Sequence, residues 1–420
     1  MSAETTVTQR SQTSPSAAAP LDSSWRLGVL IVAVTVSLID LYYHLPAAGG
    51  YHVAADEGAY YRHARSVSLH GWGGLRLTAE EYIGDRGLHI YPPPTRLLST
   101  LTNALALGVD DSYRSLAVLS LVWFVVLIFL ARHYVSRLWD ERVGLIASLF
   151  LTFSPLFMAM AKRALIDSLS SLLSAWVLFS FLDYARHHRR RSLVSFCIAV
   201  AFSLLNRETA ILFCPFYAGS LLLLTPRERL ATECKTIAVA TMSIAAAVSV
   251  VMVAAFGIHN LVGIGAALYR SQILMHHSYA VVYCNGPWYR YLVDLMLLSP
   301  MTLILATLAA GRTLLDRQRD LRIDLLLAFF AYVLVVFVFT YKNIRYATVL
   351  DIEVRLLAAI GVVQLVNTWT ATQIARRRAL CLVVLMLVAF DLRSFHRYFV
   401  TDDIYDPVSA SLLAAERFIP

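Results

Sequence analysis

Residues 27–41 read LGVLIVAVTVSLIDL and contain no charged side chain before Asp40. With the apolar residues on either side, this run is long enough to cross the hydrocarbon core of a membrane as a helix. The sequence of 420 residues is 58% hydrophobic and 15% charged, a composition that excludes a single soluble globular domain. We therefore expect an all-α polytopic membrane protein.

Apolar runs of helical length recur along the chain and predict about eleven spans. They cover residues 26–45, 114–131, 143–160, 165–184, 193–208, 210–224, 236–256, 291–310, 323–341, 347–368 and 379–392. Residues 26–392 then form one transmembrane domain, followed by a short external segment over 393–420. Residues 1–25 are expected to be a disordered cytoplasmic tail, because Met1 to Pro20 has no apolar core of the kind found in a signal peptide.

Basic residues gather in alternate short loops and predict the orientation of the chain. These loops cover residues 132–142, 186–191, 227–235, 312–322 and 376–378. By the positive-inside tendency they face the cytoplasm, and the loops at 46–113, 161–165, 257–290 and 342–346 face outward. The net charge of +8 is therefore interpreted as a topology signal, since no basic face with interleaved aromatic residues indicates a nucleic-acid partner.

The polar segment over residues 46–113 contains two adjacent carboxylates, Asp56 and Glu57. Asp56 is a suitable N-cap for a helix over 57–69, which the glycines at 71–74 are expected to stop. The prolines at 92–94 impose an extended backbone, and a second apolar helix follows to Leu107. Amphipathic helices of this kind lie in the membrane plane, which would place Asp56 near the lipid headgroups.

Five short elements occur in order along the chain. They are Asp56-Glu57-Gly58-Ala59-Tyr60-Tyr61, Tyr91-Pro92-Pro93-Pro94-Thr95, Ala164-Leu165-Ile166-Asp167, Leu205-Asn206-Arg207-Glu208-Thr209 and Arg345-Tyr346. Together they resemble motifs of the GT-C superfamily of integral membrane glycosyltransferases, in the branch of protein O-mannosyltransferases and aminoarabinose transferases. That branch has Asp-Glu-x-x-Tyr, Pro-Pro, a second acidic element, Lys-Glu-Thr and Arg-Tyr. Aminoarabinose transferases carry Glu-Lys before proline where this chain has Ile90-Tyr91, so no metal ligand or phosphate-binding lysine is carried over from that position.

The resemblance implies a GT-C-like helix bundle with a glycosyltransferase activity. Such an enzyme would move a monosaccharide, with inversion suspected, from a polyprenyl-phosphate donor in the membrane lipid to a glycan, lipid or protein acceptor. The reaction would take place on the outer, periplasmic face of a bacterial inner membrane. The residues implied in catalysis are Asp56, Glu57 and Asp167, and those implied in donor binding include Tyr60, Arg207, Arg345 and Tyr346.

The chemistry of such a transfer requires the residue types that the resemblance implies. A polyprenyl phosphate leaves readily as an anion, so the step needs a base at the acceptor hydroxyl rather than a strong acid. Asp56 can accept that proton and stabilise the positive charge that develops at the anomeric carbon. The departing phosphate needs fixed cations. The candidates on the outward edge are Lys162, Arg163, Arg207 and Arg345.

These residues also have purely structural interpretations. Asp56 would be only a helix cap, Asp167 a salt-bridge partner of Lys162 or Arg163, Arg207-Glu208 a charged turn, and Arg345 a snorkelling helix anchor.

Two other functions stay open. A lipid-linked glycan ligase or polymerase usually has its catalytic loop late in the chain, and a lipid or solute transporter would more often carry acidic residues in mid-span.

The pattern requires no cofactor and leaves a divalent metal open. His276, His277 and Cys284 match no standard zinc spacing.

Overall fold

The structure is a computed structural model that describes residues 24–45, 56–85, 92–274, 286–316, 320–339, 343–370 and 372–403. In these ranges every regular element is helical, so the expected all-α class is confirmed. The first elements are α1 (Ser24–Tyr43), α2 (Asp56–His70), α3 (Trp72–Gly84), α4 (Leu97–Leu107), α5 (Tyr113–Leu138), α6 (Glu141–Thr152), α7 (Pro155–Ala161), α8 (Asp167–His187), α9 (Arg190–Asn206), η2 (Glu208–Phe213) and α10 (Cys214–Leu224). The others are η3 (Arg227–Arg229), α11 (Leu230–Phe256), α12 (Ile258–Leu274), α14 (Arg290–Leu298), α15 (Pro300–Leu315), α16 (Leu321–Val338), η5 (Ile344–Ala347), α17 (Thr348–Trp369), α18 (Gln373–Phe395) and the π-helical turn η6 (His396–Thr401).

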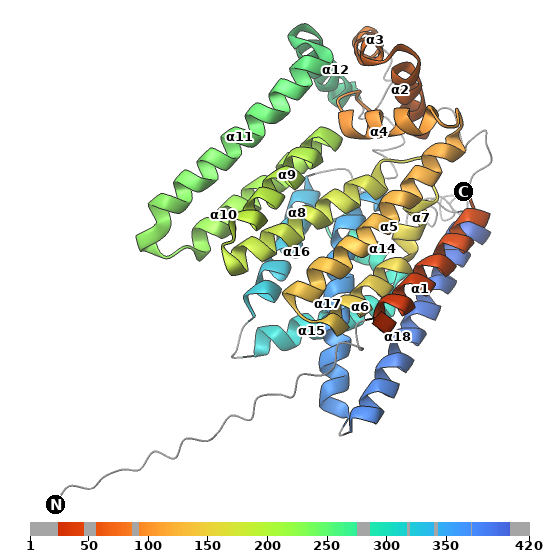
Figure 1. The fold of residues 1–420 in the computed structure, drawn as a ribbon, viewed down its shortest axis with the longest axis vertical. Coiled ribbons are helices and arrows are strands. Elements are labelled where there is room, and N and C mark those ends of the chain that lie inside the picture. Colours follow the sequence, from red (N-terminus) through yellow and green to blue (C-terminus); the bar gives the residue numbers. More distant parts are fainter. Residues whose placement is uncertain are drawn as a thin grey trace, which may run out of the picture.

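A bundle of long helices forms the body of the molecule, and α8 and α17 lie near its centre (Figure 1). α8 packs against α5 and α9, and α17 packs against α15 and α6. α1 lies at the edge and buries only Leu30, Val34, Ser37 and Leu41, which recur with the spacing of one helix face. The apolar residues on its other faces are exposed, as expected of a helix that borders lipid.

Six described helices are long and apolar enough to span a membrane, and up to eight spans result if each of two bent helix pairs is one span. The count of about eleven is therefore not confirmed. Two of the expected spans, near 143–160 and 291–310, are helix pairs bent by 57° and 119°. In the span expected over 193–208, the helix α9 has only 17 residues. The 22-residue helix α17 carries Asp351, Glu353 and Arg355, and these charges lower its mean hydropathy.

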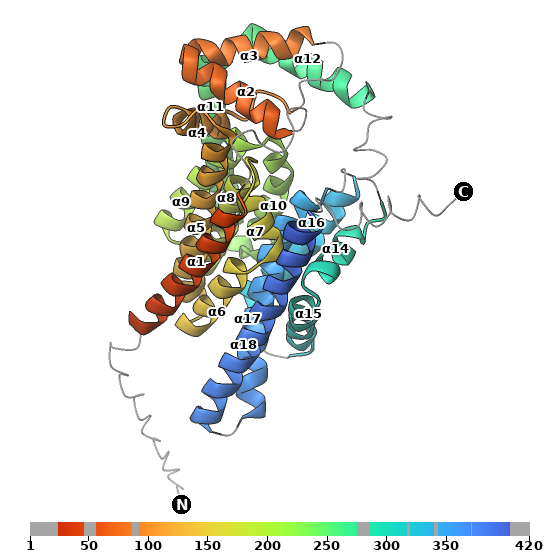
Figure 2. The ribbon, with the colours of Figure 1, turned by 90° about the vertical axis from the view of Figure 1, so that its right-hand side faces the viewer.

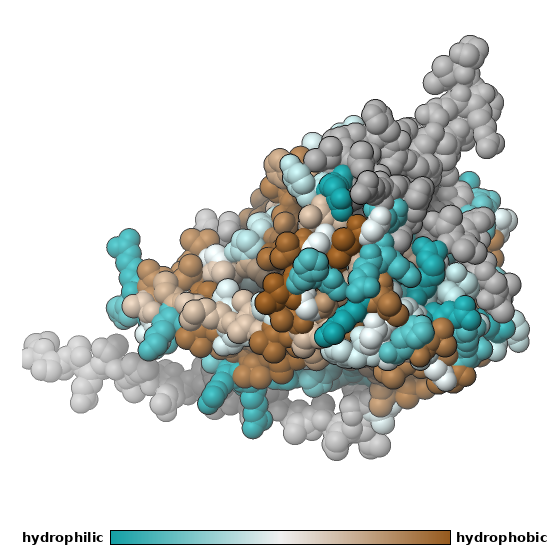
Figure 3. Space-filling model, turned by 90° about the horizontal axis from the view of Figure 1, so that it is seen from above, coloured by the Kyte–Doolittle hydropathy of each residue, from teal (hydrophilic) through white to brown (hydrophobic). Residues whose placement is uncertain are grey.

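A layer of shorter helices covers one end of the bundle (Figure 2). It consists of α2, α3, α4 and α12, which pack on one another as the pairs α2–α3, α2–α4 and α3–α12. The helix expected over 57–69 is confirmed as α2, and Tyr60, Ala64 and Val67 are its buried apolar residues. Viewed from above this end, the coloured part of the surface carries hydrophilic side chains with apolar ones beside them (Figure 3).

α3 lies where the sequence predicted no helix. Gly71, with φ 57°, separates it from α2. A Cβ atom at Gly74 would lie 2.3 Å from the backbone oxygen of Ser66 in α2, so glycine is required for the close packing of the two helices. The glycines that were expected to stop the helix therefore turn the chain and let a second helix pack against the first.

Candidate active site

Two carboxylates and two guanidinium groups from four distant segments form a chain of alternating charges. Arg345 donates a hydrogen bond from Nη2 to Asp56 Oδ2 at 2.6 Å. Its Nη1 lies 3.6 Å from Asp167 Oδ2. Arg207 donates from Nη1 to Asp167 Oδ1 at 3.3 Å. The order along this chain of charges is Asp56, Arg345, Asp167, Arg207.

Each of these side chains lies at the end of a helix or in a turn. Asp56 and Asp167 are the first residues of α2 and α8. Arg207 follows the last residue of α9 in an extended conformation, before η2 begins. Arg345 lies in η5. The backbone N–H of Arg345 donates a hydrogen bond to Asn343 Oδ1 at 3.1 Å, which fixes this turn. Helix ends at one face of the bundle therefore bring together residues that the sequence separates widely.

Two further ion pairs flank the chain of charges. Arg96 donates to both carboxylate oxygens of Glu208, at 3.0 and 3.4 Å, and also to the hydroxyl of Tyr60. Arg163 donates to Glu57 Oε1 at 3.2 Å. Glu57 is only 2% exposed. The side chain of Glu57 is therefore nearly closed off from solvent, at the start of α2.

Sequence reasoning missed Arg96, and it named Glu208 only within the Lys-Glu-Thr-like element and as part of a charged turn. Arg96 is 4% exposed, and 112 positions separate it from Glu208. The available signal was its position directly after Thr95, the last residue of the element that contains the prolines at 92–94. A buried arginine next to such an element needs an anionic partner, which sequence alone does not identify.

The electrostatics keep the first carboxylate ionised. Burial alone would raise the pKa of Asp56, but the charge and hydrogen bond of Arg345, with Arg96 and Arg207 further away, lower it below its usual value. The pKa of Glu208 is also lowered, because Arg96 outweighs the effect of burial. Burial raises the pKa of the Tyr60 phenol, which therefore stays protonated.

A partly open pocket is lined by Arg207 and contains about 650 Å³ of space not filled by atoms. Its polar residues include Asn206, Arg207 and Tyr346, its apolar residues include Leu173, Phe213 and Phe337, and most of its lining surface is apolar. The guanidinium of Arg207 lies 4.4 Å from the centre of the Tyr346 ring, in a cation–π contact. The pocket thus combines a cation with a mostly apolar surface.

The structure brings together most of the residues that the sequence singled out. Asp56, Asp167, Arg207, Arg345 and Tyr346 lie in one network, and Tyr60 and Glu57 border it through Arg96 and Arg163. The structural interpretation of Asp167 as a partner of Lys162 or Arg163 is wrong, because its partners are Arg207 and Arg345.

Lys162 lies apart from this network. Its ammonium donates to the backbone oxygen of Phe399, and burial lowers its pKa. Tyr91, His276, His277 and Cys284 lie outside the described residues.

Comparison with known proteins relates this arrangement to membrane enzymes. Residues 91–254 match the family of dolichyl-phosphate-mannose-protein mannosyltransferases. The fold resembles that of ArnT from Cupriavidus metallidurans bound to undecaprenyl phosphate, with a TM-score of 0.58 and 15% identity over 88% of this chain and 75% of that one. It also resembles the oligosaccharyltransferase AglB from Archaeoglobus fulgidus in complex with an inhibitory peptide and a dolichol-phosphate, with a TM-score of 0.58 and 14% identity over 90% of this chain and 56% of that one. None of the curated protein sequences matches the chain.

The chain is a polytopic α-helical membrane protein with the fold of these transferases. This fold and the family match over residues 91–254 agree with the resemblance to the GT-C superfamily of integral membrane glycosyltransferases.

Proposed function

We propose that this protein transfers a monosaccharide from a polyprenyl-phosphate donor to an acceptor on the outer face of a membrane, in the manner of a bacterial inner-membrane enzyme. The observation that carries the proposal is the chain of charges from Asp56 to Arg207, which ends at an apolar-walled pocket. A lipid phosphate needs this combination, since its head requires cations and its tail requires an apolar path.

Arg207 is the first candidate for the donor phosphate. It reaches Asp167 at 3.3 Å and lines the pocket, so a phosphate at the pocket mouth can meet its guanidinium while the lipid tail follows the apolar walls. Arg345 lies next in the chain of charges and supplies the second cation. Two guanidinium groups on one phosphate would also stabilise the charge that the phosphate gains as the sugar leaves.

Asp56 is the candidate base. The acceptor oxygen attacks the anomeric carbon, the bond from that carbon to the phosphate oxygen breaks with its electron pair on the phosphate, and the acceptor proton moves to Asp56. The lowered pKa of Asp56 keeps it ionised before this step. Attack from the face opposite the phosphate would invert the anomeric configuration.

Asp167 is proposed as a positioning residue, because both of its oxygens face arginines of the proposed phosphate site. It is 1% exposed and cannot easily reach an acceptor. Glu57 and Arg163 are proposed to fix the start of α2, and Arg96 with Tyr60 and Glu208 to fix α2 against η2.

The test is a transfer assay with the purified protein in lipid. Radiolabelled polyprenyl-phosphate sugars are supplied one at a time, together with membrane extracts that contain glycan, lipid and protein acceptors. The proposal expects release of polyprenyl phosphate and label in an acceptor for at least one donor, and loss of both in Asp56→Asn. Movement of labelled lipid across sealed vesicles without any transfer would overturn the proposal in favour of a transporter. Transfer of preassembled glycans alone would favour a ligase or polymerase.

A further inference from the structure

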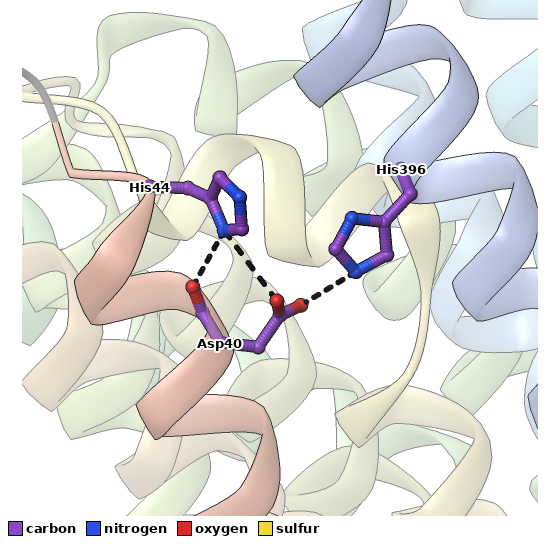
Figure 4. A group of neighbouring side chains, drawn as sticks. All are labelled: Asp40, His44 and His396. Atoms are coloured by element: carbon purple, nitrogen blue, oxygen red, sulfur yellow. Dashed lines mark hydrogen bonds and ion pairs between the residues drawn. The ribbon is translucent and has the colours of Figure 1, made fainter.

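Three potential metal ligands converge outside the candidate active site. Asp40 and His44 lie at the end of α1, and His396 begins the π-helical turn η6 after α18 (Figure 4). One ligand atom from each of the three lies within 4.8 Å of the others. Among the residues that the structure describes, no other group of three or more histidine, cysteine or acidic side chains meets this condition.

The separations are close to those of a metal site. His44 Nδ1 lies 3.4 Å from Asp40 Oδ1, and His396 Nε2 lies 3.1 Å from Asp40 Oδ2. Ligands about 2.0–2.2 Å from a tetrahedral zinc ion are about 3.3 Å apart, so small side-chain rotations would bring the three donor atoms around one ion. The two imidazoles lie on either side of the carboxylate, with their ring centres 5.5 Å apart.

The local structure explains why these side chains meet. Asp40 and His44 are four positions apart, so they lie on the same face of α1, one turn from each other. His396 comes from a segment far along the chain, at the point where α18 passes into a π-helical turn. Single π-turns re-aim side chains and are frequent at functional sites. His44 Nδ1 also lies 2.7 Å from the backbone oxygen of Asp40, a hydrogen bond that would give way to the metal.

We propose that Asp40, His44 and His396 bind a divalent transition metal of the Zn²⁺ class, with water in the fourth position. Two imidazoles and one carboxylate are a donor set that suits zinc, iron and cobalt rather than calcium or magnesium. None of the three belongs to the proposed catalytic network, so the site is independent of the proposed function.

The place of the site in the fold indicates what the metal does. It joins the end of α1 to η6, and the Phe399 backbone oxygen in η6 accepts a hydrogen bond from Lys162. The next residue, Arg163, pairs with Glu57 at the start of α2. A bound metal would therefore join the end of α1 to η6, which in turn contacts the segment of Lys162 and Arg163, and its role is structural support of the fold.

The alternative is an ordinary histidine–carboxylate contact, and the chain offers a matched control for it. In α8, His187 lies four positions after Asp183, with Nδ1 3.2 Å from Asp183 Oδ1. This pair has the same spacing and the same hydrogen bond to the backbone oxygen, but no second histidine completes it in the described residues. A contact without metal should behave alike at both places.

The experiment uses the full-length protein, purified in detergent and treated with a chelator. It is titrated with Co²⁺, whose visible absorption reports nitrogen and oxygen ligation, and Zn²⁺ is then added in competition. We expect one equivalent of metal, with the affinity reduced by about tenfold or more in His44→Gln, His396→Gln and Asp40→Asn. His187→Gln should keep full affinity. Zn²⁺ should raise the thermal midpoint of the wild type and of His187→Gln but not of the other three variants.

Two results would overturn the proposal. One is a wild type that binds Co²⁺ no better than a His44→Gln/His396→Gln double variant. The other is an equal loss of affinity in His187→Gln. The metal-free thermal midpoint of each variant identifies any that fails to fold, and Asp40→Asn, which keeps the shape of the side chain, then serves in its place.

Discussion

Arg345 lies 2.6 Å from Asp56, although 289 positions separate the two residues in the sequence. In the proposed function these are the phosphate-binding cation and the base, and without donor they neutralise each other. A phosphate that reaches Arg345 competes with Asp56 for the guanidinium. Donor binding would then release the carboxylate towards the acceptor, which couples arrival of the donor to activation of the base.

The role of Asp56 as base can be tested by one substitution. Asp56→Asn keeps the size of the side chain but cannot accept the proton, so the transfer rate should fall by about 10²–10⁴-fold, the usual contribution of a general base. Donor binding should stay within a factor of a few. The matched control is Asp110→Asn, which removes an exposed carboxylate from the same external segment. Full activity in Asp56→Asn would exclude Asp56 as the base.

Arg207 and Arg345 should contribute much of the binding free energy for the lipid phosphate. Arg207→Ala and Arg345→Ala are each expected to weaken polyprenyl-phosphate binding by about 1–3 kcal/mol, the range for a lost charge-assisted contact. Lysine should restore only part of this, since it lacks the bidentate guanidinium. A binding titration measures the effect, with Arg65→Ala as control, because Arg65 is half exposed and pairs with Asp111. Unchanged affinity with lowered stability would make these arginines structural anchors.

The lowered pKa of Asp56 and of Glu208 predicts how stability changes with pH. A carboxyl whose pKa is lower in the folded than in the unfolded state stabilises the fold above the unfolded pKa of about 4 and loses this effect as the pH falls through the folded pKa. The contribution of these two carboxylates to stability should therefore be constant above about pH 5 and be lost as the pH falls below about pH 4.

In Arg345→Met, Asp56 loses the largest influence that offsets its burial, while Arg96 and Arg207 remain, so the pKa of Asp56 should rise. Protonation of Asp56 then costs the folded state less, so lowering the pH from about 6 to 4 should cost this variant less stability than the wild type. Thermal unfolding across this pH range provides the measurement, with Arg65→Met as control. Identical pH profiles for Arg345→Met and the wild type would contradict the electrostatic account.

Sequence predicted the helical class and most of the candidate site, because both depend on local patterns. The helix α2 begins at Asp56, one residue before its expected start, and four of the five elements contribute residues to the network. The roles of these residues stay predictions. The partners could not be predicted, because the pairing of Arg96 with Glu208 and of Asp40 with His396 depends on how helix ends from distant segments meet. The count of about eleven spans is not confirmed, because charged helices such as α17 and bent helix pairs differ from simple apolar spans.

A buried polar network in the bundle should be a large contributor to stability. Arg355, 1% exposed, donates to Asp351 at 2.9 Å, to Asp391 at 2.7 Å and to Ser299 at 2.9 Å. Arg355→Met leaves two buried carboxylates without their cation, which should cost about 3–5 kcal/mol. Adding Asp351→Asn and Asp391→Asn should recover much of this loss, because the uncompensated charges are then gone. Denaturant unfolding in detergent measures both, with the exposed Arg377→Met as control. A stable single variant would show that water or lipid headgroups reach the network.

The basic loops predict that the active-site end faces outward, and chemical labelling can test this orientation. Gly73 in the outer helical layer is exposed, and a Cβ atom there would meet nothing within 4 Å, so Gly73→Cys should be tolerated. Arg191, also exposed, lies at the start of α9, in the basic stretch over 186–191 that the positive-inside tendency assigns to the cytoplasm. In a background without the native cysteines, a membrane-impermeant thiol reagent added to cells with a permeable outer layer should label Gly73→Cys and leave Arg191→Cys unlabelled. Lysed cells should label both, which controls for the reactivity of each cysteine. The reversed pattern in intact cells would put Asp56 on the cytoplasmic side, where an outward acceptor could not reach it, and the proposed direction of transfer would have to be given up.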